Sequence, residues 1–295
     1  MTVLVTGATG NVGSQVVREL IALGMPVRAF VRDEDRARAR LAPDVQLTVG
    51  DLSDASSVER ALAGVDRVFL SSADGPDKVG HEAGVVDAAA AAGVRLIVKA
   101  STMLAKAGSP LPPLDWNGRS EEHLLRSGVP ATLLRSGFYM TNLLMAAEQV
   151  SGSGTVVAPA ADGRIAMIDP RDIGAVAAVV LTEPGHEGRS YRLTGPEAIG
   201  YDDVAAELSR ATGSPVRYVD VPEPAARAGL EATGMPGWLV EHLVGVFRLV
   251  RAGGLAEVTD DVRLVTGRAP RGFGDFAADH AGVFGARSAA GAAGR

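Results

Sequence analysis

The chain has 295 residues, of which 46% are hydrophobic and 22% charged, a composition that excludes an intrinsically disordered or collagen-like chain. Its formal net charge of −6 at pH 7 argues against nucleic-acid binding, because contacts with phosphates need a basic face. It contains no cysteine, which excludes disulfides, thiolate metal sites and a catalytic thiol.

The first half of the chain alternates short β-branched runs with helical patterns. The first strand-like run, Val3–Val5, is followed by apolar residues at helical spacing, and Gly24-Met25-Pro26 ends that helix. Strands separated by helices predict right-handed crossovers and a parallel sheet covered on both faces. Further strands are predicted at 27–31, 45–49, 65–70, 94–98 and 131–134, and helices at 35–41, 55–62, 79–92 and 115–125. The predicted fold class is α/β, a doubly wound parallel sheet of the Rossmann type.

The pattern changes beyond about residue 150. Strands are predicted at 155–158, 164–168, 189–193 and 216–219, helices at 170–181 and 201–211, and largely helical structure after Pro222. We therefore predict a dinucleotide-binding domain at 1–150 and a smaller, mostly helical substrate-covering part at 151–286. The second part is expected to pack on the first and to be interleaved with it. Residues 287–295, rich in Ala, Gly and Ser, predict a disordered tail.

The N-terminal region shows no targeting signal. An apolar run begins already at Val3, which leaves no room for the basic region and cleavage site of a signal peptide. The longest apolar stretches, Ile173 to Leu181 and Leu239 to Val250, are too short or too interrupted to span a bilayer. We therefore expect a cytoplasmic protein without membrane contact.

A glycine-rich segment lies directly between the first strand and the first helix. Glycines there allow a tight turn and let the backbone approach a pyrophosphate, which then lies at the N-terminus of the helix. The alternative is a plain strand-to-helix turn, but the strand–turn–helix context favours a dinucleotide. The predicted cofactor-binding residues of this segment are Gly7, Thr9, Gly10, Asn11, Val12 and Gly13.

The Gly-x-x-Gly-x-x-Gly spacing resembles the extended and atypical branches of the short-chain dehydrogenase/reductase superfamily. Blocks along nearly the whole chain resemble the NmrA-like, NAD(P)-binding atypical reductases. These blocks are Val3–Gly10, Val31-Arg32, Gly50-Asp51-Leu52, Ser127–Pro130 with Thr132–Arg135, Ile168–Ile173, Tyr191–Pro196 and Thr266–Pro270. The resemblance implies a Rossmann fold with NAD(P) as cofactor.

The residues after the second strand indicate which cofactor is used. An acidic residue there holds the ribose hydroxyl of NAD, whereas an arginine accommodates the 2′-phosphate of NADP. Arg32 matches the family position that implies NADP, with Arg36 one helical turn further on, while Asp33 argues for NAD. The charge run is also typical of a solvated helix start. We predict NADP (NADPH), with NAD as the alternative.

Three further regions of the chain are expected to contact the cofactor. The resemblance implies that Asp51, followed by Leu52, accepts a hydrogen bond from the adenine amino group; the alternative for Asp51 is a residue at the N-terminus of a helix. Small residues end the fourth strand at the carboxyl edge of the sheet, where they would let the nicotinamide ribose approach. Phe138 and Tyr139 are expected either to border the nicotinamide ring or to pack in the core. The small residues of the fourth strand are Ser71, Ser72 and Ala73.

The usual catalytic pair of the superfamily is missing. Standard members use a tyrosine with a lysine four residues later, but this chain has only three lysines, and all of them precede its four tyrosines. Ser101 or Thr102 falls where the superfamily places its substrate-orienting serine, and a hydroxyl can donate a hydrogen bond to a developing alkoxide. Lys99 is expected to bond the nicotinamide ribose or to extend towards solvent at the strand end. The lysines are Lys78, Lys99 and Lys106.

The helix that replaces the tyrosine and lysine region carries Asn117, the remaining catalytic candidate there. Tyr139 is an alternative donor, although its ordinary pKa of about 10 makes it a modest acid. Glu121 and Glu122 are expected on an exposed helix face, and His123 is expected to pack or to face solvent. The five histidines are scattered, so no metal site is predicted. The proton is expected to come from water or from an acidic hydroxyl of the substrate.

The last part of the chain indicates the substrate class. The helix predicted from Gly237 to Val250 has a broad apolar stripe, which is typical of a domain core or of a lid over a flat, apolar, aromatic substrate. Lysine-poor, arginine-rich usage resembles high-GC actinobacterial proteins and favours tailoring of an aromatic polyketide ketone in antibiotic biosynthesis. We predict an NADPH-dependent reductase of a ketone or quinone. The alternatives are a non-catalytic NAD(P)-sensing regulatory protein and an epimerase or dehydratase that uses bound NAD.

Overall fold

The computed structural model describes residues 1–285, so the tail predicted at 287–295 lies outside the described residues. The chain forms two compact units. Unit 1 comprises Met1–Gly137, Pro170–Leu193 and Asp260–Ala269, and unit 2 takes in Phe138–Asp169, Thr194–Thr259 and the chain from Pro270 on. This division differs from a single boundary at residue 150. The first segment of unit 1 ends at Gly137, and unit 1 also includes Pro170–Leu193 and Asp260–Ala269.

Unit 1 is built on a seven-stranded parallel sheet with the strand order β3-β2-β1-β4-β5-β6-β8. The order reverses between β1 and β4, which is where open α/β sheets bind ligands. The predicted doubly wound fold is therefore confirmed. The strands are β1 (Val3–Val5), β2 (Val27–Val31), β3 (Gln46–Val49), β4 (Arg67–Leu70), β5 (Leu96–Thr102), β6 (Ala131–Ser136) and β8 (Ser190–Leu193).

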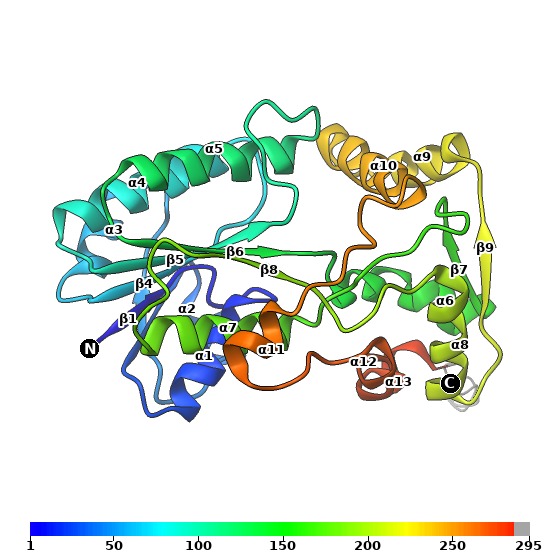
Figure 1. The fold of residues 1–295 in the computed structure, drawn as a ribbon, viewed down its shortest axis with the longest axis horizontal. Coiled ribbons are helices and arrows are strands. Elements are labelled where there is room, and N and C mark those ends of the chain that lie inside the picture. Colours follow the sequence, from blue (N-terminus) through cyan, green and yellow to red (C-terminus); the bar gives the residue numbers. More distant parts are fainter. Residues whose placement is uncertain (286–295) are drawn as a thin grey trace, which may run out of the picture. The chain divides into compact units, whose positions relative to one another are not determined.

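Helices cover both faces of this sheet, as Figure 1 shows, with α3, α4 and α5 on one face and α1 and α7 on the other. Apolar side chains alternate along the strands, and one set packs beneath α3, α4 and α5, with Val68, Leu70 and Ile97 almost fully buried. The helices of unit 1 are α1 (Gly13–Ala22), α2 (Glu34–Arg38), α3 (Ala55–Leu62), α4 (Lys78–Ala91), α5 (Pro112–Arg126), α7 (Pro170–Thr182) and α11 (Asp261–Thr266).

Two segments from beyond residue 150 complete unit 1. Strand β8 pairs in parallel with β6, with Tyr191 opposite Leu134. Helix α7 packs closely on α1, because Gly174 leaves room for Gln15. Asp261 at the start of α11 accepts a hydrogen bond from the backbone N–H of Arg192 at 2.6 Å. The sheet therefore gains its seventh strand from a region that composition alone assigned to the second part.

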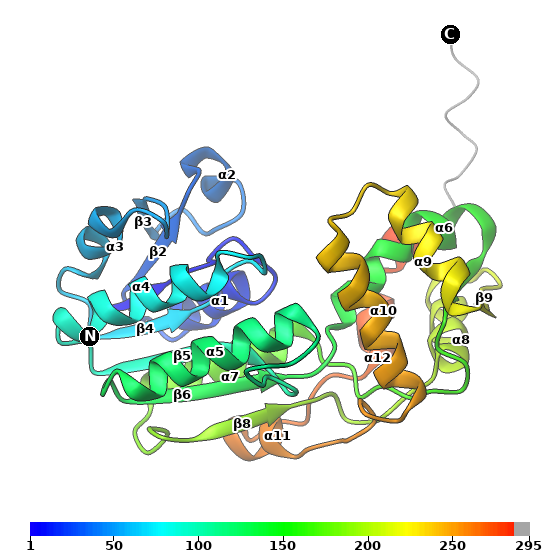
Figure 2. The ribbon, with the colours of Figure 1, turned by 90° about the horizontal axis from the view of Figure 1, so that it is seen from above.

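Unit 2 is mostly helical, with a small parallel sheet of two strands, β7 and β9. Its core gathers aromatic residues such as Tyr201, Phe273 and Phe276. The elements are a 3-10 helix (Met140–Ala146), α6 (Ala147–Ser153), β7 (Thr155–Ala158), α8 (Tyr201–Thr212), β9 (Arg217–Asp220), α9 (Glu223–Ala232), α10 (Gly237–Arg251), α12 (Phe273–Asp279) and α13 (Ala281–Phe284). Figure 2 labels its helices α6, α8, α9, α10 and α12.

The strand predicted at 164–168 is wrong. Residues 165–168 are all buried rather than alternating, and their backbone bonds go to three separate segments. Ile165 pairs with Ile199 in an isolated bridge, and the N–H of Ile168 bonds to the carbonyl of Phe138. The segment therefore crosses the core of unit 2 without a continuous ladder. Within residues 1–285, no helix has both the length and the apolar character needed to cross a bilayer.

The close packing of α7 on α1 is testable with a glycine substitution. A Cβ at Gly174 would lie 2.6 Å from Cβ of Gln15, so we expect Gly174→Ala to lower the free energy of unfolding by about 1–3 kcal/mol. The matched control is Gly84→Ala in α4, where a Cβ meets nothing within 4 Å and alanine should stabilise the helix by about 0.5–1 kcal/mol. Urea unfolding followed by circular dichroism measures both. Equal effects of the two variants would contradict the packing described.

Candidate active site

The glycine segment has the shape of a cradle for a dinucleotide phosphate. Gly7 has a φ of +60°, and a Cβ there would lie 2.8 Å from the carbonyl oxygen of Ser71. A Cβ at Gly13 would lie 2.2 Å from the carbonyl oxygen of Gly7, so both positions need glycine. No side chain caps α1 at Val12, and its first turn holds no acidic residue. This helix end is open to an anion, so the residues present fit the phosphates of a dinucleotide.

The glycine segment is fixed to the neighbouring strand by Thr6. Its hydroxyl donates to the carbonyl oxygen of Ser71 at 2.8 Å and accepts the N–H of Ser71 at 2.9 Å. This double contact ties the end of β1 to the end of β4. Thr9, Gly10 and Asn11 lie beyond it and are partly or fully exposed. The middle of the predicted phosphate-binding turn is therefore accessible, whereas Val12 and Gly13 at its end are buried.

The structure bears on the choice between NAD and NADP through Asp33. Its Oδ1 accepts the backbone N–H of Arg36 at 2.9 Å, so this carboxylate is the N-cap of α2. The one acidic side chain that argued for NAD is thus engaged in its own helix. Arg32 and Arg36 are exposed, and Arg40 donates to the carbonyl oxygen of Thr9 at 3.2 Å. The guanidinium group of Arg40 therefore contacts the glycine segment directly.

Asp51 does not cap the following helix, because the N-cap of α3 is Asp54. Its Oδ1 instead accepts the N–H and the hydroxyl of Ser53 at 2.8 and 2.7 Å. These hydrogen bonds lower the pKa of Asp51, and the charge on Arg32 adds to the effect. The carboxylate is therefore ionised and lies within the field of Arg32. Leu52 packs against the core beneath α3.

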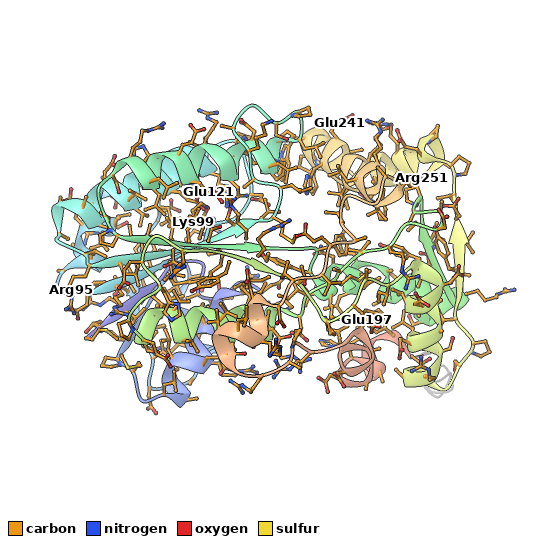
Figure 3. All side chains as sticks on the ribbon, viewed as in Figure 1. Arg95, Lys99, Glu121, Glu197, Glu241 and Arg251 are labelled. Atoms are coloured by element: carbon orange, nitrogen blue, oxygen red, sulfur yellow. The ribbon has the colours of Figure 1, made fainter. Side chains whose placement is uncertain are left out.

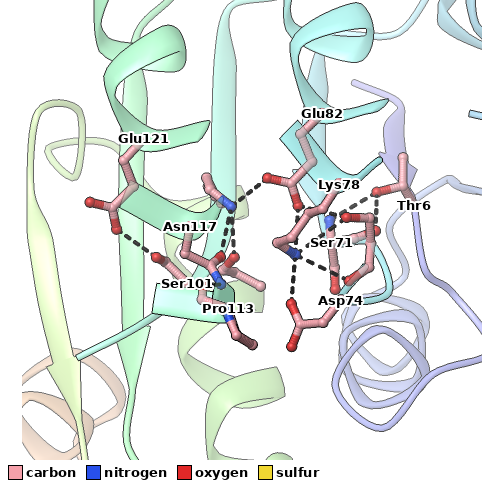
Figure 4. A network of polar contacts seen from close by, with 12 residues as sticks. Thr6, Ser71, Asp74, Lys78, Glu82, Ser101, Pro113, Asn117 and Glu121 are labelled. Carbon is pink, nitrogen blue, oxygen red and sulfur yellow. Dashed lines mark hydrogen bonds and ion pairs between the residues drawn. The ribbon is translucent and has the colours of Figure 1, made fainter. Parts of the chain in front are cut away.

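The end of β4 is held by a lysine and a glutamate of α4, as Figure 4 shows. Ser72 is half-buried, and its hydroxyl donates to Oε1 of Glu82 at 2.8 Å. Lys78 donates to the carbonyl and hydroxyl oxygens of Ser72, both at 3.3 Å. Lys78 also pairs with Glu82 at 3.0 Å and with the exposed Asp74 at 3.4 Å. Ser71, Ser72 and Ala73 thus leave the sheet in a fixed conformation.

Lys99 does not extend towards solvent. Figure 3 shows it between the sheet and α5, and its side chain is fully buried. It lies on the face of β5 covered by α4 and α5, where Nζ pairs with Oε2 of Glu82 at 2.6 Å and donates to Oδ1 of Asn117 at 3.3 Å. The expected strand-end position is wrong because β5 continues to Thr102. Asn117 in turn donates to the carbonyl oxygen of Pro113 at 2.9 Å, so it supports the lysine.

Glu82 is charged despite its burial. Burial alone raises the pKa of a carboxyl group, but the ammonium groups of Lys99 and Lys78 outweigh it and lower the pKa of Glu82 to about 2. Burial lowers the pKa of Lys99 more than Glu82 raises it. For Lys78, burial lowers the pKa, but Glu82 and Asp74 together raise it above its ordinary value. Lys78 therefore carries its proton at neutral pH.

Glu121 is buried, so the expectation of an exposed helix face is wrong for this residue. Asn117, Glu121 and Leu124 share the face of α5 that lies on the sheet. Oε1 of Glu121 accepts the Ser101 hydroxyl at 2.5 Å, and Arg135 on β6 binds both carboxylate oxygens. Arg135 lies directly opposite Ser101 in the sheet, which brings the three groups together. Sequence reasoning missed this cluster, although the helical spacing of Glu121 with Asn117 and Leu124 is a usable signal.

The Ser101 contact changes what that residue can do. A serine hydroxyl has one proton, and here it is donated to a buried carboxylate. In this conformation Ser101 presents its lone pairs to a neighbouring group, and its expected donation to an alkoxide, which needs the hydroxyl to turn away from Glu121, stays a prediction. Thr102 is half-buried, and its hydroxyl has no hydrogen-bond partner within residues 1–285. Phe138 packs against the core of unit 2 and Tyr139 pairs with Ile168 there, so their place beside the nicotinamide stays a prediction.

The comparisons with known proteins agree with this geometry. The sequence model of the NmrA-like family matches residues 1–262. The chain is 40% identical to an NAD(P)H azoreductase of Xenophilus azovorans, over 96% of this chain and 99% of the relative. It is also 40% identical to a (4-alkanoyl-5-oxo-2,5-dihydrofuran-3-yl)methyl phosphate reductase of Streptomyces griseus, with the same coverage. The crystal structure of an Escherichia coli NADPH-dependent quinone oxidoreductase with NADPH superimposes with a TM-score of 0.85, at 32% identity, over 94% of this chain and 99% of that one.

The buried carboxylate gives a pH-dependent prediction. Because the pKa of Glu82 is lowered on folding from its ordinary 4.5 to about 2, its stabilising contribution is present above about pH 4.5 and is lost as the pH falls towards 2. We expect Glu82→Gln to lower the free energy of unfolding by about 3–5 kcal/mol at pH 7, and by progressively less below pH 4.5. Urea unfolding at several pH values measures the difference.

The matched control is Glu122→Gln on the exposed face of α5. Its carboxylate pairs only with exposed Arg126, so the change should stay below about 0.5 kcal/mol. A difference between wild type and Glu82→Gln that stays constant down to pH 3 would contradict the ionised state of Glu82.

Proposed function

Because this chain belongs to the NmrA-like family, we propose that it is an NADPH-dependent reductase that adds a hydride to the carbonyl group of a quinone or an aromatic ketone. At the coarser level the chain is an NAD(P)H-dependent oxidoreductase. The observation that carries the proposal is the likeness to two reductases at 40% identity over nearly their whole length. The glycine cradle in unit 1 supplies the matching cofactor geometry.

The residues proposed to hold the cofactor combine the glycine geometry of unit 1 with the positions that the family resemblance implies. The turn from Gly7 to Gly13 would bind the pyrophosphate, and Arg32 would bind the 2′-phosphate of NADPH. Asp51 would accept the adenine amino group beside Leu52, and the segment 71–73 would border the nicotinamide ribose. Bound in this way, NADPH supplies the hydride of the reaction.

Of the residues proposed around the reacting end, Lys99 positions other groups, whereas Ser101 and Thr102 can contact a ligand. Lys99 is too deeply buried to reach a ligand, so it acts through Glu82 and Asn117 on the ends of β4 and β5. The Ser101 hydroxyl donates a hydrogen bond to Glu121, so its oxygen would accept a hydrogen bond from the cofactor or the substrate. Thr102 keeps its hydroxyl available within the described chain and can donate to the substrate oxygen.

The proposed acceptor is apolar and aromatic. In unit 2, Val246 and Phe247 of α10 pack on the core, while Trp238 and Leu239 on the same helix are only half-buried. The relatives are named for substrates that are electron-poor conjugated acceptors, namely azo, quinone and unsaturated furanone compounds. Such groups accept a hydride readily because the negative charge spreads over the conjugated system. An aromatic polyketide quinone or ketone has the same chemistry.

A sensor is the second candidate function. The chain lacks the tyrosine–lysine pair that usually supplies the proton. The Ser101 hydroxyl donates to Glu121 and does not replace that acid in this conformation. A regulatory protein that only binds the dinucleotide would need no such acid. The two candidates differ in whether the bound cofactor is consumed.

The cofactor assignment predicts the effect of Arg32→Ala. Loss of one charged hydrogen-bond donor to the 2′-phosphate should weaken NADPH binding about 10- to 100-fold and leave NADH binding within about threefold. The control is Arg60→Ala on α3, which removes an exposed arginine away from the cradle. Isothermal titration calorimetry measures the dissociation constants. Equal weakening of NADPH and NADH binding would contradict the role of Arg32.

Turnover separates the two candidate functions. We expect the protein to oxidise NADPH in the presence of naphthoquinones, and to do so faster than with hydroxyaryl ketones, which are less electrophilic. Loss of NADPH absorbance measures the rate, and product analysis identifies the hydroquinone or alcohol. Equal affinity for NADPH and NADP⁺ without turnover on quinones, ketones or azo dyes would instead establish the sensor.

A further inference from the structure

A reduced carbonyl oxygen needs a proton, and this chain has no tyrosine with a lysine four residues later to supply it. Within unit 1, four hydroxyl groups lie at the carboxyl ends of β4 and β5, on Ser71, Ser72, Ser101 and Thr102. Their neighbours differ. Ser101 contacts Glu121, which is paired with Arg135, and a guanidinium group cannot give up a proton in a protein. Thr102 has no partner that would replace a lost proton within residues 1–285. The Ser71 hydroxyl likewise contacts no proton source in that part of the chain.

Ser72 is therefore the one hydroxyl of the four with a proton source beside it. The ammonium group of Lys78 lies 3.3 Å from its Oγ, and the carboxylate of Glu82 lies 2.8 Å from the same atom. Ser72 is half-buried, so a ligand can reach it, whereas the side chain of Lys78 is only 4% exposed. If the Ser72 proton turns away, Glu82 keeps its contacts with Lys78 and Lys99, so no buried charge is left unpaired.

We propose that Ser72 delivers the proton to the substrate oxygen and that Lys78 restores it, in place of the absent tyrosine–lysine pair. This inference rests on the proposed reductase function. The carbonyl carbon gains the hydride that the cofactor supplies, and the oxyanion takes the proton of Ser72. The Ser72 oxygen then takes a proton from the Lys78 ammonium group. The neutral amine regains one from water beside Asp74, whose side chain is 45% exposed and lies 3.4 Å from Nζ.

The remaining residues of the cluster position this pair. Glu82 holds Lys78 against Ser72, and Lys99 holds Glu82 from the other side at 2.6 Å. Lys78 and Glu82 lie one helical turn apart on α4, so both side chains point to the same side of the helix. Thr6 fixes Ser71, the residue before Ser72, to the end of β1. Every element that bounds the carboxyl edge at this point therefore restrains the Ser72 hydroxyl.

The test compares two acceptors that differ in their need for a proton. A naphthoquinone or aromatic ketone gains a hydride and a proton, whereas a triarylmethyl dye cation becomes neutral by gaining a hydride alone. We expect Ser72→Ala to lower the ratio of kcat on the ketone to kcat on the cation by about 100-fold, because general acid catalysis contributes about 100- to 10,000-fold. Lys78→Arg keeps the charge but cannot release a proton, so it should lower the ratio similarly.

Two further variants serve as controls. Ser72→Thr keeps a hydroxyl and should restore most of the ratio. Lys106→Met removes the one lysine outside the cluster, which is exposed, and should leave the ratio within about threefold of wild type. A purely structural role for Ser72 and Lys78 would slow both acceptors equally, and an unchanged ratio would overturn the proposal.

A second measurement does not depend on turnover. 4-Nitrophenol with NADP⁺ imitates the product oxygen, and its absorbance reports its ionisation. If Ser72 donates to that oxygen, the pKa of the bound phenol should be lower in wild type than in Ser72→Ala. No difference between the two proteins would overturn the proposal. A wild-type protein that reduces neither acceptor would refute the proposed function and this inference with it, whereas turnover with an unchanged ratio refutes the role of Ser72 alone.

Discussion

A single buried carboxylate organises the end of the sheet where ligands bind. Glu82 has no exposed surface, and water therefore cannot stabilise its charge. It stays ionised because Lys78 and Lys99 approach it from two sides. Those three side chains come from α4 and β5, and they reach the end of β4 through Ser72 and α5 through Asn117. Removing the carboxylate would leave two ammonium groups facing each other in the core, so the geometry of this edge depends on it.

The rest of unit 1 is arranged around the same edge. Glycine is required at Gly7 and Gly13 because backbone atoms of neighbouring residues occupy the space of a Cβ. Thr6 then joins this turn to Ser71, and Glu82 and Lys78 hold the following residue. The phosphate end and the reacting end of the proposed cofactor site are thus one continuous hydrogen-bonded structure. A substitution at either end is expected to alter the conformation of the other end, because both ends share the backbone at the termini of β1 and β4.

Local patterns predicted most of the fold, and tertiary contacts explain what they missed. The strand–glycine–helix start and the alternation of strands and helices are encoded within short windows, and the sheet was predicted from them. The NmrA-like family was implied by the resemblance of sequence blocks along nearly the whole chain. The buried states of Lys99 and Glu121 were not, because their partners Glu82 and Arg135 lie 17 and 14 residues away in sequence. A charged residue is normally exposed, and its burial can be predicted only when the oppositely charged partner beside it is known. The segment 164–168 failed for a related reason, because an apolar run predicts burial, whereas its pairing depends on distant segments, here Ile199, Leu255 and Phe138.

The composition of the chain gains a chemical meaning from this cluster. Arginine supplies 26 of the 29 basic residues, and arginine serves well wherever a fixed positive charge or a bidentate contact is needed, as Arg135 shows with Glu121. It cannot serve where a proton must leave and return, because the guanidinium group stays charged in proteins. Two of the three lysines lie in the one buried cluster at the edge of the sheet, on either side of a single carboxylate. In a chain that otherwise uses arginine, lysine at position 78 is best explained by the one property that arginine lacks.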